Sequence, residues 1–563
     1  MLDPLSVAGL ALAVFDELLK LGKTTAEVIS DIRTFDEDVL HTQKKIRFQI
    51  WRMDGLNLLF RQSPVYGDES LIQRFDTEAQ HEIRNSLDEL CTLLDQALRL
   101  LKRIAGPKAA AQIKDQPNAS SSISTSVTPG STRSTLAPAT ALTLKVSEPH
   151  LSSKRSTVQL LKWSFRDKKD ISAVVGKFAD VNDRLLEMIR FWSLASAIGV
   201  DLRHLEHLQK DEDAVMLGLH EDASLALALS DTGYAPRNFE LDECWDGVLQ
   251  ESGPMGDPFA VFQWNGRHIL RENCLSLPIE ATSIDPQTRN RINSLTQLLH
   301  QPKEELFCIL RCEGWRVLPH SERITYLYEI PVGRKPEPES LLRLLNNANT
   351  TNVCPSLDVK FNLAYSLARS IAQLHMVKWV HESFRSENIL FFAPESQHTT
   401  DALPSNAPET VDLRQPWIFG FEFSRPESFF SAGFIDTCPD RDVYRHPERQ
   451  GQPLTTFRKV HDIYSLGVVL LEIGIWRPAV TLERHRFAHA KDSQGRPCGI
   501  TKHLIRHAQK HLVNQMGSKY RDIVLKCLSG NFGIVDDTKE DLKLQQAFRT
   551  QVVDILRKAA ENI

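Results

Sequence analysis

Residues 374–391 read LHMVKWVHESFRSENILF, and this stretch decides how the C-terminal half of the chain is interpreted. The residues just before it, 361–373, place apolar side chains three and four positions apart, which is the spacing of a helix with one buried face. A polar turn containing His381 and Asn388 follows. The run from 389 to 392 is short and apolar and predicts a strand. The stretch therefore predicts a helix, a polar turn and a strand, in that order.

The polar turn resembles the catalytic loop of protein kinases, in which His-Arg-Asp-Leu is followed at a fixed spacing by Asn. His381 and Asn388 stand at the matching positions. The catalytic Asp of the family accepts the proton of the substrate hydroxyl, and here its position holds Ser383. Because a serine hydroxyl is a poor base, the match predicts the architecture of the loop without its chemistry.

A second motif, further along the chain, resembles the Asp-Phe-Gly of kinases, whose Asp binds Mg²⁺. Phe419 and Gly420 match, but Ile418 replaces the Asp. An isoleucine side chain offers no ligand to a cation. Together with Ser383, this substitution implies a pseudokinase, which is a kinase-like domain that transfers no phosphate and holds neither a metal nor another cofactor.

Three later segments resemble the C-terminal lobe of kinases. Residues 462–473 resemble the Asp-x-Trp-Ser-x-Gly segment, with Asp462 and Gly467 at its fixed positions, and Glu448 matches the end of Ala-Pro-Glu. A late helix is expected over residues 519–528. The resemblance implies that Asp462 hydrogen-bonds the backbone of the catalytic loop and that Glu448 and Gly467 are structural. The alternative is an unrelated helical domain that carries these residues by chance.

Several of these side chains have a second interpretation. His381 could act as a base or pack beneath the loop, and Asn388 could bind a metal or make a structural hydrogen bond. Ser383 could pair with His381 as a nucleophile, although no third, orienting acid is evident. Glu422 could supply a displaced carboxylate for a metal, which would make the protein a divergent but active kinase.

The region before the loop predicts a smaller, β-rich lobe. The expected elements are strands over residues 259–264, 306–315 and 323–331 and a helix over residues 288–300. No Gly-x-Gly-x-x-Gly precedes the first strand, and Arg267 and Arg271 do not match the lysine of Val-Ala-Ile-Lys. Recognisable nucleotide-binding side chains are therefore missing. The resemblance implies an α+β bilobal kinase-like fold, with an N-lobe at about 258–332 and a C-lobe at about 333–563.

The composition is that of a globular protein with several domains. The chain has 563 residues, of which 42% are hydrophobic and 25% charged. A net charge of −5 gives no support for binding nucleic acid. The nine cysteines show neither Cys-x-x-Cys pairs nor histidines at metal-binding spacing, and so predict reduced thiols. Without a run of about 18 apolar residues or a basic N-terminal leader, a cytoplasmic location is expected.

The first helix is expected to begin at Asp3 and Pro4, an N-cap followed by a proline at the first helical position. Its apolar run is uniform up to Phe15 rather than confined to one stripe. The candidate membrane-inserting side chains are Leu5, Val7, Leu10, Leu12, Val14 and Phe15. A helix that is apolar all round is either buried in a bundle or destined for lipid, and both alternatives remain open at this point.

The following residues predict a bundle of helices over residues 1–210. Residues 26–105 are helical in pattern, with Leu40, Ile46 or Arg47, Ile50 and Trp51 near one face. Residues 106–152 are rich in Ser, Thr, Ala and Pro and predict a disordered insertion, because they cannot bury enough surface to offset the entropy of ordering. The helical pattern then resumes. Residues 211–257 are acidic and predict a loop-like linker.

The N-terminal region resembles the fungal HeLo family, the helical domain of the HET-S incompatibility protein, which acts in prion inhibition and propagation. The resemblance rests on Asp3 and Pro4 with Val-Ala-Gly at 7–9, on Phe35-Asp36 leading to Arg47 and Trp51, and on Lys162-Trp163-Ser164-Phe165-Arg166-Asp167-Lys168-Lys169. It implies an all-α bundle whose first helix can leave the bundle and enter a membrane.

Taken together, the two resemblances predict a multidomain protein in which an inactive kinase-like domain controls a HeLo-type helical effector. Such a protein would act in fungal immunity, heterokaryon incompatibility or regulated cell death by disrupting membranes. The expected partners are other HeLo-type or signalling proteins, a second copy of the chain and, on activation, membrane lipid. The alternatives are a divergent active kinase and a purely regulatory adaptor.

Overall fold

The computed structural model divides the chain into two compact units, one of residues 1–57 and 80–186 and the other of residues 58–79 and 187–563. The residues that it describes are 6–31, 37–61, 64–66, 69–105, 165–229, 238–251, 258–276, 284, 286–300, 307–317, 323–351, 354–395, 411–421, 424–426, 439–450, 455–482, 499–537 and 541–563. The division falls inside a helix, whereas the sequence placed the domain boundary near residue 210. The predicted insertion at 106–152 lies outside the described residues.

The first unit is built from four helices that share one apolar core. They are α1 (Val7–Asp31), α2 (Glu37–Arg61), α4 (Thr77–Ala105) and α6 (Phe165–Ala195), of which α2, α4 and α6 also extend into the second unit. Val28, Ile46, Leu98 and Ile171 bring one side chain from each helix into this core. At its side, the Nδ2 of Asn182 donates to the backbone oxygen of Gln49 at 3.3 Å. The helical character expected for this region is therefore observed.

The first helix, α1, presents one buried face. Ala8, Ala11 and Phe15 are buried, as is Leu12, whereas Asp16 and Glu17 are exposed. Of the other candidate side chains, Val7, Leu10 and Val14 are half-buried, and Leu5 lies outside the described residues. Ala13 lies on the exposed face, whereas Ala8 and Ala11 are buried, so the sequence appears apolar on both sides. In the described part of the chain, no helix combines the length and the apolar character needed to cross a membrane.

The prediction of which face of α2 is buried is wrong in part. Ile46 and Ile50 are buried, but Leu40, Phe48 and Trp51 are exposed by 45%, 52% and 52%. The helix carries apolar side chains on both faces, so the sequence did not show which face packs inward. The rings of Phe48 and Trp51 lie 5.9 Å apart instead of contributing to the core.

The prediction of a loop-like linker over 211–257 is also wrong, because the described residues there include three helices. These are α8 (Glu212–Met216), α9 (Leu219–Leu229) and α10 (Cys244–Glu251). Asp211 caps α8 by accepting a hydrogen bond from the backbone of Ala214 at 3.0 Å. The acidic run thus stands at a helix N-terminus, where carboxylates are favoured by free N–H groups and the helix dipole.

The second unit contains a four-stranded antiparallel sheet with the order β1-β2-β4-β3. The strands are β1 (Phe259–Trp264), β2 (Arg267–Ser276), β3 (Cys312–Val317) and β4 (Arg323–Glu329), and α11 (Pro286–His300) lies between β2 and β3 in the sequence. The elements expected at 259–264, 288–300 and 323–331 are confirmed to within a few residues. The strand expected at 306–315 starts only at Cys312, because Cys308 has a φ of 54° that a strand does not accept.

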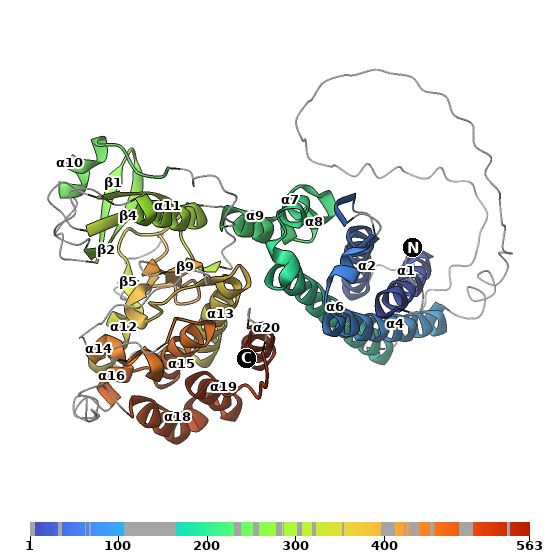
Figure 1. The fold of residues 1–563 in the computed structure, drawn as a ribbon. Helices are drawn as coiled ribbons and strands as arrows, with labels where there is room; N and C mark the ends of the chain where they lie inside the picture. The colour runs from blue at the N-terminus through green and yellow to red at the C-terminus, as the bar shows by residue number, and fades with distance from the viewer. Residues whose placement is uncertain are drawn as a thin grey trace, which may run out of the picture. The chain divides into compact units, whose positions relative to one another are not determined.

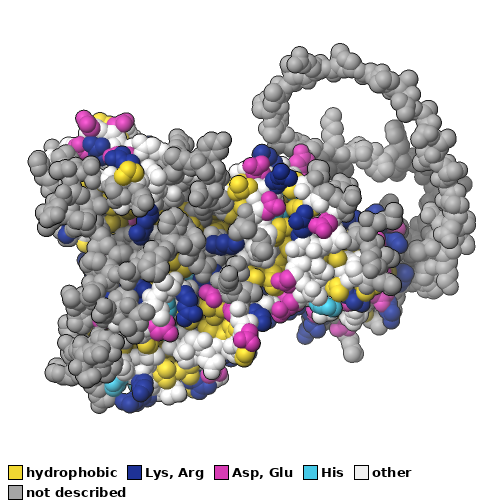
Figure 2. Space-filling view, viewed as in Figure 1, with side chains coloured by type: hydrophobic (Ala, Val, Ile, Leu, Met, Phe, Trp, Pro, Cys, Tyr) yellow, Lys and Arg dark blue, Asp and Glu magenta, His cyan; other side chains and the backbone are white. Residues whose placement is uncertain are grey.

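The rest of the second unit is mainly helical (Figure 1). Its principal elements are α12 (Leu341–Thr351), α13 (Leu357–Met376), α15 (Lys459–Ile475), α18 (Ile500–Met516), α19 (Ser518–Ser529), α20 (Leu542–Phe548) and α21 (Asp554–Asn562). The helix α15 is the centre of this part, since its residues are buried from His461 to Gly474. Figure 2 shows acidic and basic side chains intermixed over the visible face of the described residues. The fold is therefore multidomain and mixed α and β, with helices predominating.

Close packing between α15 and α19 depends on Gly467. A Cβ at this position would lie 2.7 Å from the Cβ of Cys527, which is well inside van der Waals contact. We expect Gly467→Ala to lower the free energy of unfolding by about 1–3 kcal/mol through overpacking, measured as a shift of the urea midpoint. Gly176→Ala in α6 is the matched control, because no atom lies within 4 Å of its added Cβ. That control should stabilise by about 0.5–1 kcal/mol, and equal shifts in the same direction would contradict the packing argument.

Candidate functional site

The loop that carries His381 and Ser383 is held by the carboxylate of Asp462, in the first turn of α15. This fully buried side chain accepts hydrogen bonds from the backbone N–H of His381 at 2.8 Å and of Glu382 at 3.0 Å. It also accepts one from the Nε2 of His375, at the end of α13, at 3.1 Å. Three donors replace the water that the carboxylate loses on burial. The loop, α13 and α15 are thus joined at one point.

Ser383 is buried, and its hydroxyl oxygen receives hydrogen bonds from two neighbouring side chains. The Nη1 of Arg385 donates to Oγ at 2.6 Å, and the Nδ2 of Asn388 lies 3.3 Å from the same atom and 2.9 Å from the Ser383 carbonyl oxygen. A hydroxyl that accepts from a guanidinium is not made more basic by that contact. The arrangement stabilises the turn and leaves no carboxylate at the position where a general base would stand.

His381 lies beneath the loop and is fully buried. Its Nδ1 accepts a hydrogen bond from the backbone N–H of Ser383 at 3.2 Å, and its ring lies 4.5 Å from the ring of Phe421. Burial lowers the pKa of His381 to about 4, with the Asp462 carboxylate acting in the opposite sense. Because Nδ1 faces the amide of Ser383 rather than its hydroxyl, the two side chains are not arranged as a base and its nucleophile.

The residues expected at the second motif lie directly against this loop. The strand β8 (Trp417–Ile418) pairs with β7 (Ile389–Phe391), with Ile418 opposite Ile389. The backbone N–H of Phe419 donates to the carbonyl oxygen of Asn388 at 2.8 Å. Gly420 has a φ of 81°, and a Cβ there would lie 2.0 Å from the Nδ2 of Asn388. Only glycine fits this position. Glu422, the candidate displaced carboxylate, lies outside the described residues.

A carboxylate that the sequence analysis did not single out also enters this site. Glu272 of β2 is buried, and its Oε1 accepts a hydrogen bond from the backbone N–H of Gly420 at 2.7 Å. Its Oε2 accepts one from the Tyr328 hydroxyl at 2.8 Å. The ring of Phe419 lies 5.5 Å from that of Phe259 and 5.1 Å from that of Tyr328. A buried acid, Glu272, and two aromatic rings, those of Phe259 and Tyr328, therefore face the second motif.

A group of possible metal ligands is formed by His446, Glu448 and His461, whose ligand atoms lie within 4.8 Å of one another. The Nδ1 of His461 accepts from the backbone N–H of Arg458 at 3.1 Å, so its proton is on Nε2, which faces Glu448 at 3.3 Å. A metal-binding histidine instead donates from its second nitrogen. The Arg458 guanidinium also lies 3.6 Å from the same carboxylate oxygen. These contacts fit a structural hydrogen-bond group better than a metal site.

Behind the loop lies a second buried acid, Glu472 of α15. Its Oε1 accepts from the Tyr444 hydroxyl at 2.7 Å and from the backbone N–H of Ala479 at 2.7 Å. The Tyr444 hydroxyl also lies 2.7 Å from the Oγ of Ser386. Burial raises the pKa of Glu472 to about 7, although these hydrogen bonds lower it in part. The sequence analysis included Glu472 in the segment 462–473 but assigned it no role.

Two comparisons with known proteins gave matches. A family model described as a domain of unknown function (DUF7580) matches residues 289–563. A serine/threonine-protein kinase-like protein of Arabidopsis thaliana is 30% identical over 146 residues, which is 26% of this chain and 36% of that protein. The match therefore spans about a third of the relative's length. Over the matched residues the chain is similar to a kinase-like protein.

The pH dependence of stability should reveal the buried Glu472. Its pKa is raised from 4.5 to about 7 on folding, so its stabilising contribution is complete below about pH 4.5 and is lost as the pH rises through 7. We expect Glu472→Gln to remove this loss, so that the variant gains up to about 3 kcal/mol on the wild type between pH 4.5 and 8. Urea unfolding at four pH values measures the difference. Parallel pH profiles for the two proteins would show that the carboxylate does not titrate in this range.

Proposed function

We propose that residues 258–563 form a bilobal kinase-like domain that transfers no phosphate and regulates the helical region before it. The strand order β1-β2-β4-β3, with α11 between β2 and β3, suits the smaller lobe of such a fold, and α12 to α21 suit the larger one. The partial similarity to a kinase-like protein supports the same assignment. The observation that carries the proposal is the chemistry of the site between β2, the loop and the second motif.

Phosphoryl transfer requires a base for the attacking hydroxyl and a carboxylate for the metal. Ser383 and Ile418 stand at these two positions of the kinase motifs. The serine hydroxyl is a poor base, and the isoleucine side chain cannot bind a metal. In addition, the carboxylate of Glu272 binds the backbone N–H of Gly420. Its negative charge would repel a nucleotide phosphate in a region with little water to screen it. The site is therefore unsuited both to binding the nucleotide and to the reaction.

A domain of this kind would act through its shape and its contacts. The hydrogen bonds of Asp462 and the pairing of β7 with β8 keep the loop ordered without a ligand. The resemblance of the N-terminal region to the HeLo family supports a finer proposal, in which the kinase-like domain controls a helical effector that disrupts membranes in fungal immunity or cell death. The effector step would require α1 to leave positions where Ala11 and Phe15 are buried.

The proposal predicts that ATP does not stabilise the protein. A ligand present at 100 times its Kd adds about 2.7 kcal/mol to the free energy of unfolding, which a thermal-shift titration detects easily. With the full chain we expect no shift by ATP, with or without Mg²⁺, and no transfer of labelled phosphate to a protein substrate. A Mg²⁺-dependent shift that disappears in Asn388→Ala would support the divergent kinase instead.

The role of α1 is tested by placing a charge on it. Leu10 is half-buried and Ala13 is exposed, so we expect Leu10→Glu and Ala13→Glu to keep the helix content and melting temperature of the wild type. If α1 enters membranes, both variants should lose the ability to release dye from lipid vesicles, because a charged side chain in the bilayer is costly. Leakage that persists unchanged in both variants would show that α1 does not insert, and would favour a regulatory adaptor whose first helix stays in the core.

A further inference from the structure

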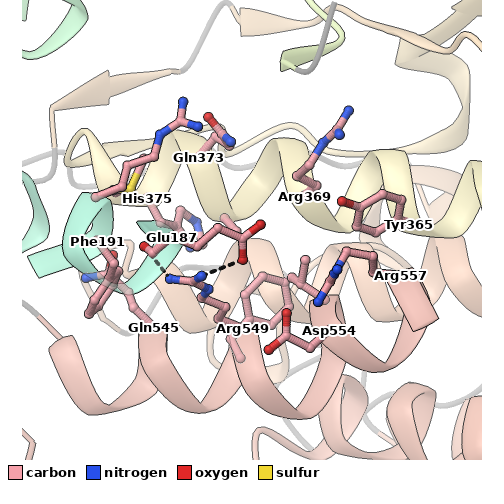
Figure 3. Close-up of a pocket in the computed structure, with 15 residues that line it drawn as sticks. Glu187, Phe191, Tyr365, Arg369, Gln373, His375, Gln545, Arg549, Asp554 and Arg557 are labelled. Carbon is pink, nitrogen blue, oxygen red and sulfur yellow. Dashed lines mark hydrogen bonds and ion pairs between the residues drawn. The ribbon is translucent and has the colours of Figure 1, made fainter. Parts of the chain in front are cut away.

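A pocket in the second unit lies between α13, the helices at the C-terminus and the last turns of α6, away from the loop of Ser383. It has an empty volume of about 680 Å³, part of which is open to solvent. Figure 3 shows Phe191 at one end of the pocket and Tyr365, Arg369 and Arg557 at the other. Two arginines therefore lie together at the Tyr365 end of the pocket.

One wall of the pocket is formed by an irregular helical turn. Residues Arg549–Val553 form a π-helix between α20 and α21, a conformation that is rare and is found often at functional sites. Arg549 is fixed in place, because its Nη1 donates to the backbone oxygen of Glu187 at 2.6 Å and its Nη2 to Oε2 of the same residue at 2.5 Å. These are the dashed contacts of Figure 3. The turn therefore forms a rigid wall.

Four arginines but only two carboxylates line the pocket. Two of the arginines are matched, Arg549 by Glu187 and Arg190 by the buried carboxylate of Asp222. The other two, Arg369 and Arg557, lie at the Tyr365 end. Positive charge therefore remains at one end of the pocket only.

Among the described residues, neither of these two arginines forms an ion pair with a buried carboxylate. The guanidinium of Arg369 lies 5.1 Å from the centre of the Tyr365 ring and forms no ion pair with the residues that the structure describes. Arg557 pairs at 3.4 Å with Glu561, a carboxylate that is 57% exposed and is therefore screened by water. The Nε atoms of both arginines are buried and lack a hydrogen-bond partner within the described chain. Buried donors of this kind normally have an acceptor.

The second carboxylate, Asp554, limits the charge that can be bound. Burial raises the pKa of Asp554, while the neighbouring Arg549 lowers it. When the exposed, water-screened carboxylate of Glu561 is left out of the count, Asp554 leaves one positive charge against Arg369 and Arg557. The lining also includes apolar side chains, among them Phe191, Met376 and Phe548. One positive charge and a partly apolar lining suit an anion with a single charge and an apolar body.

We propose that this pocket binds an amphipathic monocarboxylate. Its carboxylate would accept hydrogen bonds from Arg369 and Arg557, and its apolar chain would lie over Phe548 and Met376 toward Phe191. A carboxylate bound by two guanidinium groups forms charge-assisted hydrogen bonds, which are the strongest available to it. This proposal does not depend on the loss of phosphoryl transfer, because it uses none of the residues of the loop or of the second motif.

The test is isothermal titration of the full chain with sodium octanoate, with 1-octanol and sodium acetate as comparators. Octanoate should bind at one site per chain, and each comparator, lacking either the charge or the apolar body, should bind at least about tenfold more weakly. If octanol binds as tightly as octanoate, or if octanoate does not bind, the proposal is overturned.

Variants locate the site. Arg369→Gln and Arg557→Gln should each weaken octanoate binding by about tenfold or more, and Asp554→Asn should strengthen it by removing the competing carboxylate. Arg343→Gln is the matched control, because Arg343 on α12 is 66% exposed and lies outside the pocket. Unchanged melting temperatures verify the fold of each variant. Equal affinities in all four variants would place octanoate elsewhere on the surface and overturn the assignment.

Discussion

The buried carboxylate of Asp462 receives hydrogen bonds from two backbone N–H groups of the loop and from the ring of His375. A charged group without water is stable only when its lone pairs are satisfied, so the position of α15 fixes the position of the loop. The loop in turn fixes Asn388, whose carbonyl oxygen binds Phe419 and whose side chain lies against Gly420. The geometry of the loop and of the second motif therefore depends on the Asp462 carboxylate and its three donors.

The hydrogen bonds of Asp462 explain how the loop can keep its conformation although it lacks the general base of a kinase. Ser383 lies in the turn without affecting the Asp462 contacts, and Arg385 and Asn388 satisfy its hydroxyl. The carboxylate of Glu272 accepts two hydrogen bonds from within the protein, where an exposed carboxylate would bind water or a ligand. Internal contacts alone thus keep the loop ordered. A loop ordered in this way can form a well-defined signalling surface without catalysing phosphoryl transfer.

The helix and strand around the loop could be predicted from the sequence because their periodicity is local. The strand β2 was missed although Asn265-Gly266 marked it: both residues have positive φ, as the tight turn between two antiparallel strands demands. With that turn recognised, Glu272 would have been placed in the sheet, but not its contact with Gly420, which joins residues far apart in the chain. Likewise, the acidic residues before α8 resemble a loop in composition, and only their position at a helix N-terminus reveals the cap. The pocket could not be anticipated, since its walls come from three separate parts of the sequence.

The π-helical turn at Arg549–Val553 sets the rotational phase of the last helix. A π turn holds more residues than an α turn, which has 3.6, so everything that follows is rotated relative to a continuous α-helix by about 100° for each additional residue. Asp554 and Arg557 face α13 only because of this offset. Deleting a single residue within the turn would restore an uninterrupted helix and direct the same side chains elsewhere. The C-terminal segment is therefore tolerant of substitutions on its outer face and intolerant of any change in its length.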